Sequence, residues 1–193
     1  MRKRTRALMV AGGLALGAVM TNPSVAQAQD VGLELGPTCL QGDLNVGYDP
    51  PLTLHTQPTT VTMTGEFTCI PLPVVASGNE IRKARLEAHG QANYGCVLGG
   101  ATARFTVIWQ DENSATVGTS VFEGRAVVNT KPGGIAETVA TGRIVEGDFL
   151  GYQVENTYVG LANPLECLSG GVKSSGGQSS LTVNKLPLSL PSA

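Results

Sequence analysis

Alternation of apolar and polar side chains is the feature that most restricts the fold of this chain. Within residues 103–110, Phe105, Val107 and Trp109 occupy every second position. Successive side chains of a β-strand point to opposite faces, so these three share one face of a strand. Helical periodicity is almost absent elsewhere, and the composition is rich in Gly, Thr and Val. We therefore expect an all-β protein.

The same alternation predicts further strands. In residues 59–68, every second residue from position 61 is apolar or glycine and is expected to point inward. In residues 83–91, small apolar residues alternate with charged ones, which favours a strand, although residues 81–88 would also suit a short helix. Additional strands are expected at residues 31–35, 52–56, 119–128, 135–146, 149–159 and 179–184.

Turn-forming residues separate these segments. Gly99-Gly100 suits a two-residue hairpin, because both central positions of a type I′ turn need positive φ. Residues 111–114 and 131–134 are further breaks, and the prolines in 49–58 and 71–73 argue against central strands there. Eight or nine short strands at this spacing predict an antiparallel β-sandwich with Ig-like or jelly-roll connectivity.

The first 28 residues have the parts of a secretory signal peptide. Four basic residues precede an apolar run of 14 residues, which is too short for a bilayer-spanning helix. The A-x-A sequence at 26–28 predicts cleavage after Ala28; a hydrophobic N-terminal helix of the folded domain is the alternative. Residues 29–193 then suffice for one β-sandwich domain with a loose tail at 186–193.

Charge restricts the partners of the mature chain. Nine basic and 15 acidic residues follow Ala28, so the net charge is −6. Nucleic acids and anionic lipids bind clustered Lys and Arg, and the one basic cluster, at residues 82–85, is offset by Glu80 and Glu87. We expect a released, monomeric protein that binds neither nucleic acid nor membrane and whose extracellular ligand or protein partner is unknown.

The cysteines also indicate export. The mature chain has four, Cys39, Cys69, Cys96 and Cys167, an even number that suits an oxidising compartment. Zinc is the alternative, but their spacing contains no C-x-x-C pair. Of the three possible pairings of two disulfides we favour Cys39–Cys69, which joins two early segments, and Cys96–Cys167, which joins the expected hairpin turn to a late loop.

Candidate catalytic residues are few. His55 stands between prolines and His89 on the polar side of its strand, so both are expected to be surface imidazoles. No G-x-S-x-G nucleophile elbow is present. Glycoside hydrolysis needs two carboxylates across a cleft, and the acidic residues, Glu146 and Asp148 among them, are scattered. We assign no catalytic residue.

Metal and cofactor motifs are equally sparse. The acidic segments 111–114 and 146–148 offer oxygens for calcium but lack the spacing of an EF-hand. The glycines around Cys96 lack the lysine and the helix of a phosphate-binding loop, and residues 169–177 read as a flexible loop. No cationic neighbour activates Cys96 as a thiol. We therefore assign no cofactor and no metal ligand.

Two features leave room for binding. Trp109 and the tyrosines 94, 152 and 158 are candidates for a ligand patch, although Trp109 shares a face with Phe105 and Val107 and is better explained as core. Residues 127–138 are a candidate loop for insertion into a protease, as in an inhibitor.

The whole mature chain has a familiar pattern. It comprises GEFTC (65–69), YGC (94–96), FTVIW (105–109), NPLECLSGGV (163–172) and GQSSLTV (177–183). This pattern resembles the small secreted β-sandwich proteins found in many copies in actinobacterial genomes, a resemblance that implies fold, export, disulfides and a bacterial origin but no catalytic residues. The sequence thus predicts a non-enzymatic extracellular or wall-associated protein with a binding or structural role; a secreted hydrolase with a carboxylate pair and a protease inhibitor are the alternatives.

Overall fold

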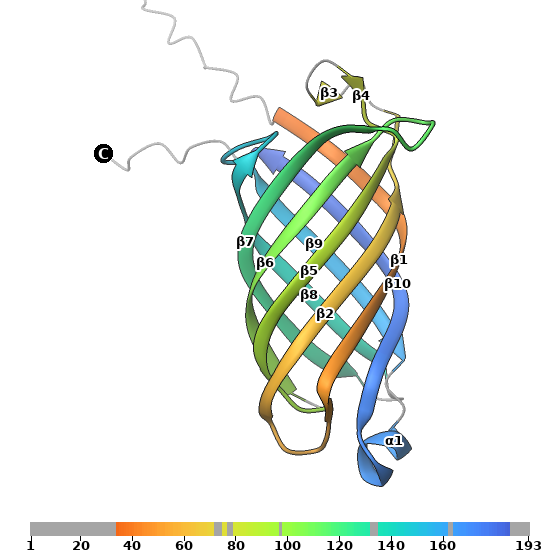
Figure 1. Ribbon diagram of the computed structural model, residues 1–193, viewed down its shortest axis with the longest axis vertical. Coiled ribbons are helices and arrows are strands. Elements are labelled where there is room, and N and C mark those ends of the chain that lie inside the picture. Colours follow the sequence, from red (N-terminus) through yellow and green to blue (C-terminus); the bar gives the residue numbers. More distant parts are fainter. Residues whose placement is uncertain are drawn as a thin grey trace, which may run out of the picture. The chain divides into compact units, whose positions relative to one another are not determined.

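The protein folds into a closed barrel of eight antiparallel strands (Figure 1). The computed structural model describes residues 34–71, 75–76, 79–96, 98–131, 135–161 and 164–185. The barrel strands are β1 (Glu34–Leu52), β2 (Gln57–Thr68), β5 (Lys83–Tyr94), β6 (Leu98–Gln110), β7 (Thr116–Lys131), β8 (Ile135–Gly147), β9 (Gln153–Leu161) and β10 (Val172–Lys185). The remaining elements are β3 (Val75–Ala76), β4 (Asn79–Glu80) and the helix α1 (Pro164–Ser169).

The sandwich expected from the sequence is wrong. Each barrel strand pairs with the next one along the chain, and β1 pairs with both β2 and β10, so the sheet has no free edge. The inward side chains of eight strands are sufficient to fill the interior of such a barrel, whereas a sandwich needs two separate sheets. Alternation tells which side chains point inward, but it does not tell whether the last strand pairs with the first.

The inward and outward faces agree with the predicted alternation. Phe105, Val107 and Trp109 on β6 are buried, and Arg104 on the same strand is exposed. On β5 the apolar residues Ala84 and Leu86 are buried while Arg85 and Glu87 are exposed, which confirms a strand there and not a helix. Eight barrel strands also agree with the expected eight or nine.

Several strand boundaries differ from the prediction. A single strand, β1, replaces the two short ones expected at 31–35 and 52–56, and it continues through Pro50 and Pro51. The prolines are accommodated because the β1–β10 register shifts between Gly47 and Leu52, where a missing N–H breaks no regular ladder. Strand β9 starts only at Gln153, after a turn, and β10 starts at Val172, seven residues before the expected position.

Gly99 and Gly100 do not form the expected hairpin turn. Both lie within β6, where Gly99 pairs with Tyr94 and Val128, and Gly100 with Asn93 and Val127. Neither glycine has a positive φ. Strand β5 ends at Tyr94 and β6 begins at Leu98, so the connection between them precedes Gly99.

Bulky side chains fill the half of the barrel that contains Trp109. The Trp109 side chain is fully buried, and its Nε1–H donates to Ser120 Oγ at 2.8 Å. The Ser120 hydroxyl in turn donates to the carbonyl of Asp148 at 2.6 Å. Phe105 and Phe122 stack at 4.4 Å between ring centroids. Trp109 is therefore core, as the sequence favoured.

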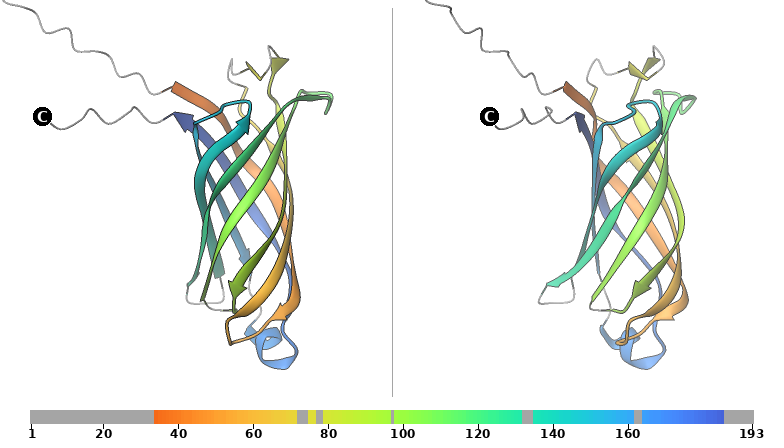
Figure 2. Two further views of the ribbon diagram at one scale, coloured as in Figure 1. Left: turned by 60° about the vertical axis from the view of Figure 1, so that its left-hand side comes forward. Right: turned by 90° about the vertical axis from the view of Figure 1, so that its left-hand side faces the viewer.

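Two disulfides join segments far apart in the sequence. Cys39 of β1 is bonded to Cys69, which follows β2, and Cys96, which follows β5, is bonded to Cys167 of α1. Both expected pairings are confirmed. The β3–β4 hairpin and α1 lie at opposite ends of the barrel (Figure 2). The cysteines of the two bonds belong to two separate clusters of buried residues.

The predicted signal peptide at 1–28 and the C-terminal tail at 186–193 lie outside the described residues. Within the described ranges, no helix has the length and hydropathy needed to cross a membrane.

Candidate ligand-binding site

The half of the barrel next to α1 contains an internal cavity. Water-sized molecules have about 60 Å³ of room in it, whereas a single water needs about 10–15 Å³. The cavity is lined mainly by apolar side chains, and every barrel strand contributes at least one. The lining residues on which the following paragraphs depend are Tyr48, Val61, Met63, Tyr94, Phe105, Ala126, Asn156, Tyr158, Gly160 and Ser175.

The cavity exists because small residues face the interior here. Ala126 and Ala140 occupy inward positions on β7 and β8, where the other half of the barrel has Phe122 and Ile144. Glycines make room for aromatic rings as well: a Cβ on Gly160 would lie 2.3 Å from the hydroxyl oxygen of Tyr158. The Tyr158 side chain therefore lies along its own strand, over a position that only glycine can occupy.

Three tyrosines bring hydroxyl groups to this half of the barrel. Tyr48 and Ser175 share a hydrogen bond of 3.0 Å between hydroxyl oxygens. The Tyr158 hydroxyl is buried and has no hydrogen-bond partner of normal geometry among the described residues, and the residue is only 4% exposed. Ser175, which is bonded to Tyr48, also lies near enough to lower the pKa of Tyr158, but not in the geometry of a regular hydrogen bond. A buried hydroxyl without a partner is costly, so Tyr158 is the cavity group most in need of one.

Burial keeps these tyrosines protonated. Desolvation raises the pKa of Tyr48 to about 12, although the Ser175 hydrogen bond acts in the opposite direction. Desolvation also raises the pKa of Tyr94 and of Tyr158. All three side chains are therefore neutral near pH 7, and each has a hydroxyl hydrogen that it can donate.

Asn156 is the other buried polar side chain of the cavity wall, and the barrel itself fixes it. Its Nδ2 donates to Ser179 Oγ and to the carbonyl of Ser180, both at 2.9 Å. The Ser179 hydroxyl donates to the carbonyl of Thr157 at 2.9 Å. This network holds the amide in one orientation and links β9 to β10.

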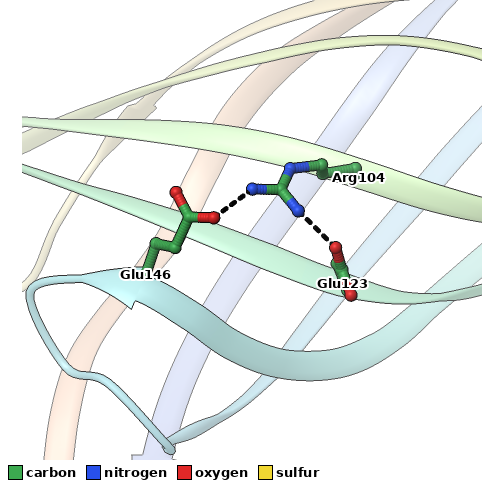
Figure 3. A network of polar contacts seen from close by, with 3 residues as sticks. All are labelled: Arg104, Glu123 and Glu146. Atoms are coloured by element: carbon green, nitrogen blue, oxygen red, sulfur yellow. Dashed lines mark hydrogen bonds and ion pairs between the residues drawn. The ribbon is translucent and has the colours of Figure 1, made fainter.

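Residues that the sequence singled out for catalysis lie elsewhere. His55 and His89 are exposed, as expected. Glu146 lies on the outer face of the barrel, where it and Glu123 both accept hydrogen bonds from Arg104 (Figure 3). These bonds, that to Glu146 foremost, raise the pKa of Arg104. The three side chains are about half exposed or more, so the network contributes little to stability.

The two acidic segments considered for calcium have structural partners. Asp148 Oδ2 accepts from the Thr119 N–H at 2.9 Å, and Asp111 Oδ1 accepts from the Ala115 N–H at the same distance. In the part of the chain that the structure describes, no three His, Cys, Asp or Glu side chains lie close enough together to hold a metal ion.

The proposed loop for protease insertion is largely regular structure. Residues 127–131 and 135–138 are paired strands of β7 and β8, and the residues between them lie outside the described part of the chain.

The sequence identified part of the cavity. Of the four candidate aromatic residues, Tyr94 and Tyr158 line it, whereas Trp109 and Tyr152 pack around Phe149 in the other half of the barrel. Tyr48 was missed. It follows Leu44 and Val46 at every second position and would have been placed inward had residues 44–48 been read as a strand.

Comparison of the chain with protein-family models, with curated proteins and with solved structures finds no match.

Proposed function

We propose that the protein is an exported, non-enzymatic binding protein that holds a small, neutral and mainly apolar molecule inside its barrel. The Tyr158 hydroxyl is the observation that carries the proposal, because it is buried in the cavity wall without a regular partner. A ligand oxygen that accepts its hydrogen would satisfy it. Ligand sites in proteins commonly combine an apolar wall with a few convergent polar groups.

Neutrality follows from the lining. No Asp, Glu, Lys, Arg or His is among the described residues that line the cavity, and its tyrosines stay protonated. A charged ligand would lose its hydration without a compensating partner, which costs several kcal/mol or more. Alcohols, ketones and esters are the chemical classes that suit this site.

Export rests on two independent observations. Residues 1–28 have the pattern of a cleaved leader, and all four cysteines beyond it are joined in disulfides, which persist in oxidising compartments. If the complete chain is expressed in a secreting bacterial host, we expect protein in the medium whose N-terminus is Gln29. Retention of residues 1–28 on protein from the medium would contradict this part of the proposal.

Binding is tested with 1-hexanol and n-hexane as probes of the disulfide-bonded protein. We expect 1-hexanol to raise the melting temperature in proportion to its excess over Kd and to give a negative heat-capacity change in calorimetry. The Tyr158→Phe variant should bind 1-hexanol about fivefold more weakly, the effect of one hydrogen bond, but n-hexane equally well. Tyr152→Phe, outside the cavity, is the control and should leave both affinities unchanged.

If neither 1-hexanol nor n-hexane binds, the proposal is refuted. An equal loss of affinity for both probes in Tyr158→Phe would show that the ring acts through packing and that its hydroxyl has no part in recognition.

A further inference from the structure

The ladder of backbone pairs is interrupted between β5 and β6. Pairing of these strands runs from Lys83↔Gln110 to Ala88↔Phe105 and resumes, in the same register, at Asn93↔Gly100. Across the described residues between these points, 89–92 and 101–104, no pair joins the two strands. Both segments nevertheless remain paired on their other sides, with β2 and β7. Both strands therefore stay in the sheet, but the regular ladder between them is missing over four positions.

Small side chains face the interior at the interruption. Ala88, Gly90 and Ala92 take the inward positions on β5, and Ala101 faces them from β6. A Cβ added to Gly90 would meet no atom within 4 Å, so the space at this point is open. Backbone groups along the two facing edges also lack the ladder hydrogen bonds that a continuous sheet supplies.

A second cavity fills this opening and adjoins the first. Water-sized molecules have about 30 Å³ of room in it. Its lining shares Val61, Met63, Tyr94, Phe105 and Ala126 with the internal cavity, so the two spaces lie on opposite sides of the same side chains. Met63 is half-buried and unbranched, and such a side chain adapts readily to a neighbour.

The two spaces together suit a narrow ligand. The internal cavity, at about 60 Å³, is well below the roughly 150 Å³ that accommodates a benzene ring. An unbranched chain needs less width than a ring, and the opening gives it length. The outer rim does not select an acid: Arg104 at the rim is already bonded to Glu123 and Glu146, and Glu87 lies in the same outer groove.

Accepting the proposed function, we propose that its ligand is an unbranched alkyl chain with one neutral oxygen. The oxygen accepts from Tyr158, and the chain passes Met63 and Phe105 into the opening between β5 and β6. Because the second cavity continues the space there, chains longer than the internal cavity continue to gain affinity with length. Each methylene that becomes buried should raise the affinity about fourfold.

The test compares 1-butanol with 1-octanol on the disulfide-bonded protein. Gly90→Val places a side chain in the opening, where its Cβ meets no atom within 4 Å, so the variant is expected to fold with an unchanged or higher melting temperature. It should bind 1-butanol as before but 1-octanol at least tenfold more weakly. Asn93→Val is the matched control, because Asn93 is exposed on the same strand and lines neither cavity, and it should leave both affinities unchanged.

Hydrogen exchange supplies a readout that does not depend on any ligand. We expect amides in residues 89–92 and 101–104 to exchange faster than those in the paired segments 84–88 and 105–108. Binding of 1-octanol, but not of 1-butanol, should slow the exchange of the amides in residues 89–92 and 101–104. Equal protection of the two sets of amides, or unchanged 1-octanol binding by Gly90→Val, would overturn the role of the opening and leave the proposed function standing. If neither alcohol binds, both proposals fail.

Discussion

The adjacent glycines Gly99 and Gly100 should respond in opposite ways to alanine. Gly99 faces the interior, where a Cβ would lie 1.9 Å from Cδ1 of the Tyr94 ring. Tyr94 is only 7% exposed, so Gly99→Ala forces a buried ring to move, and overpacking of this kind costs about 1–3 kcal/mol. Gly100 faces outward, and its Cβ would meet nothing nearer than the Ala126 carbonyl oxygen at 3.6 Å. Gly100→Ala should stabilise the protein by about 0.4–1 kcal/mol, because it restricts the unfolded chain.

Urea unfolding of the two variants and of the wild type, with the disulfides intact, measures both effects. For a domain of this size the loss in Gly99→Ala corresponds to a melting temperature lower by roughly 2–12 °C. If the pair instead formed a type I′ turn, both residues would need positive φ and both variants would lose stability. A destabilised Gly100→Ala would therefore refute the assignment of Gly100 to an extended strand, and an unchanged Gly99→Ala would show that the Tyr94 ring yields without cost.

Two further predictions concern buried hydroxyls. Because burial raises the pKa of Tyr48 from 10 to about 12, its contribution to stability is complete below pH 10 and is lost as the pH rises through 12; the loss is roughly 2–3 kcal/mol. Unfolding free energies measured from pH 9 to 12 should fall less steeply in Tyr48→Phe than in the wild type, and equal slopes would contradict the shift. Ser120→Ala should cost about 2–4 kcal/mol in urea unfolding, because the Trp109 N–H and the Asp148 carbonyl both lose their partner. Thr119→Ala, at an exposed neighbouring side chain, is the control, and equal stability of the two variants would contradict the role of Ser120.

Local pattern was sufficient to predict which residues face the core. The alternation around Phe105 and Trp109 gave the buried face of β6 correctly, since the period of two is a property of the strand itself. The cysteine pairing was also predicted, because Cys39 and Cys69 belong to two early segments, whereas Cys96 follows a strand and Cys167 comes late in the chain. The alternation depends on neighbours in sequence, which one chain displays directly.

Closure of the sheet could not be predicted in the same way. Pairing of β1 with β10 joins residues about 120 to 150 positions apart, from Leu52 with Val172 to Glu34 with Lys185, and neither strand has a local feature that reports it. The prolines at positions 50 and 51 also suggested a break, because a missing N–H normally excludes a central strand. The register shift that tolerates them becomes visible only when the partner strand is known.

The cavity and the opening could not be predicted from the sequence either, because both depend on which residues meet across neighbouring strands. Gly99 was interpreted as a turn residue because glycine permits positive φ, but here glycine provides space for a ring on the neighbouring strand. The sequence shows that a residue is small; it does not show which of these two reasons applies. Only the cross-strand register places Tyr94 over Gly99.

A barrel selected for stability alone would fill this space. Cavities lower stability in proportion to their volume, and filling them is a common route to more stable variants. In this barrel Gly90 accepts a Cβ without contact, yet the position is glycine and the ladder beside it is interrupted. The variant Gly90→Val therefore tests whether the opening serves ligand binding. If the variant is more stable and loses only the binding of long chains, the open wall is explained by ligand binding; if it is more stable and loses nothing, the opening is a packing defect.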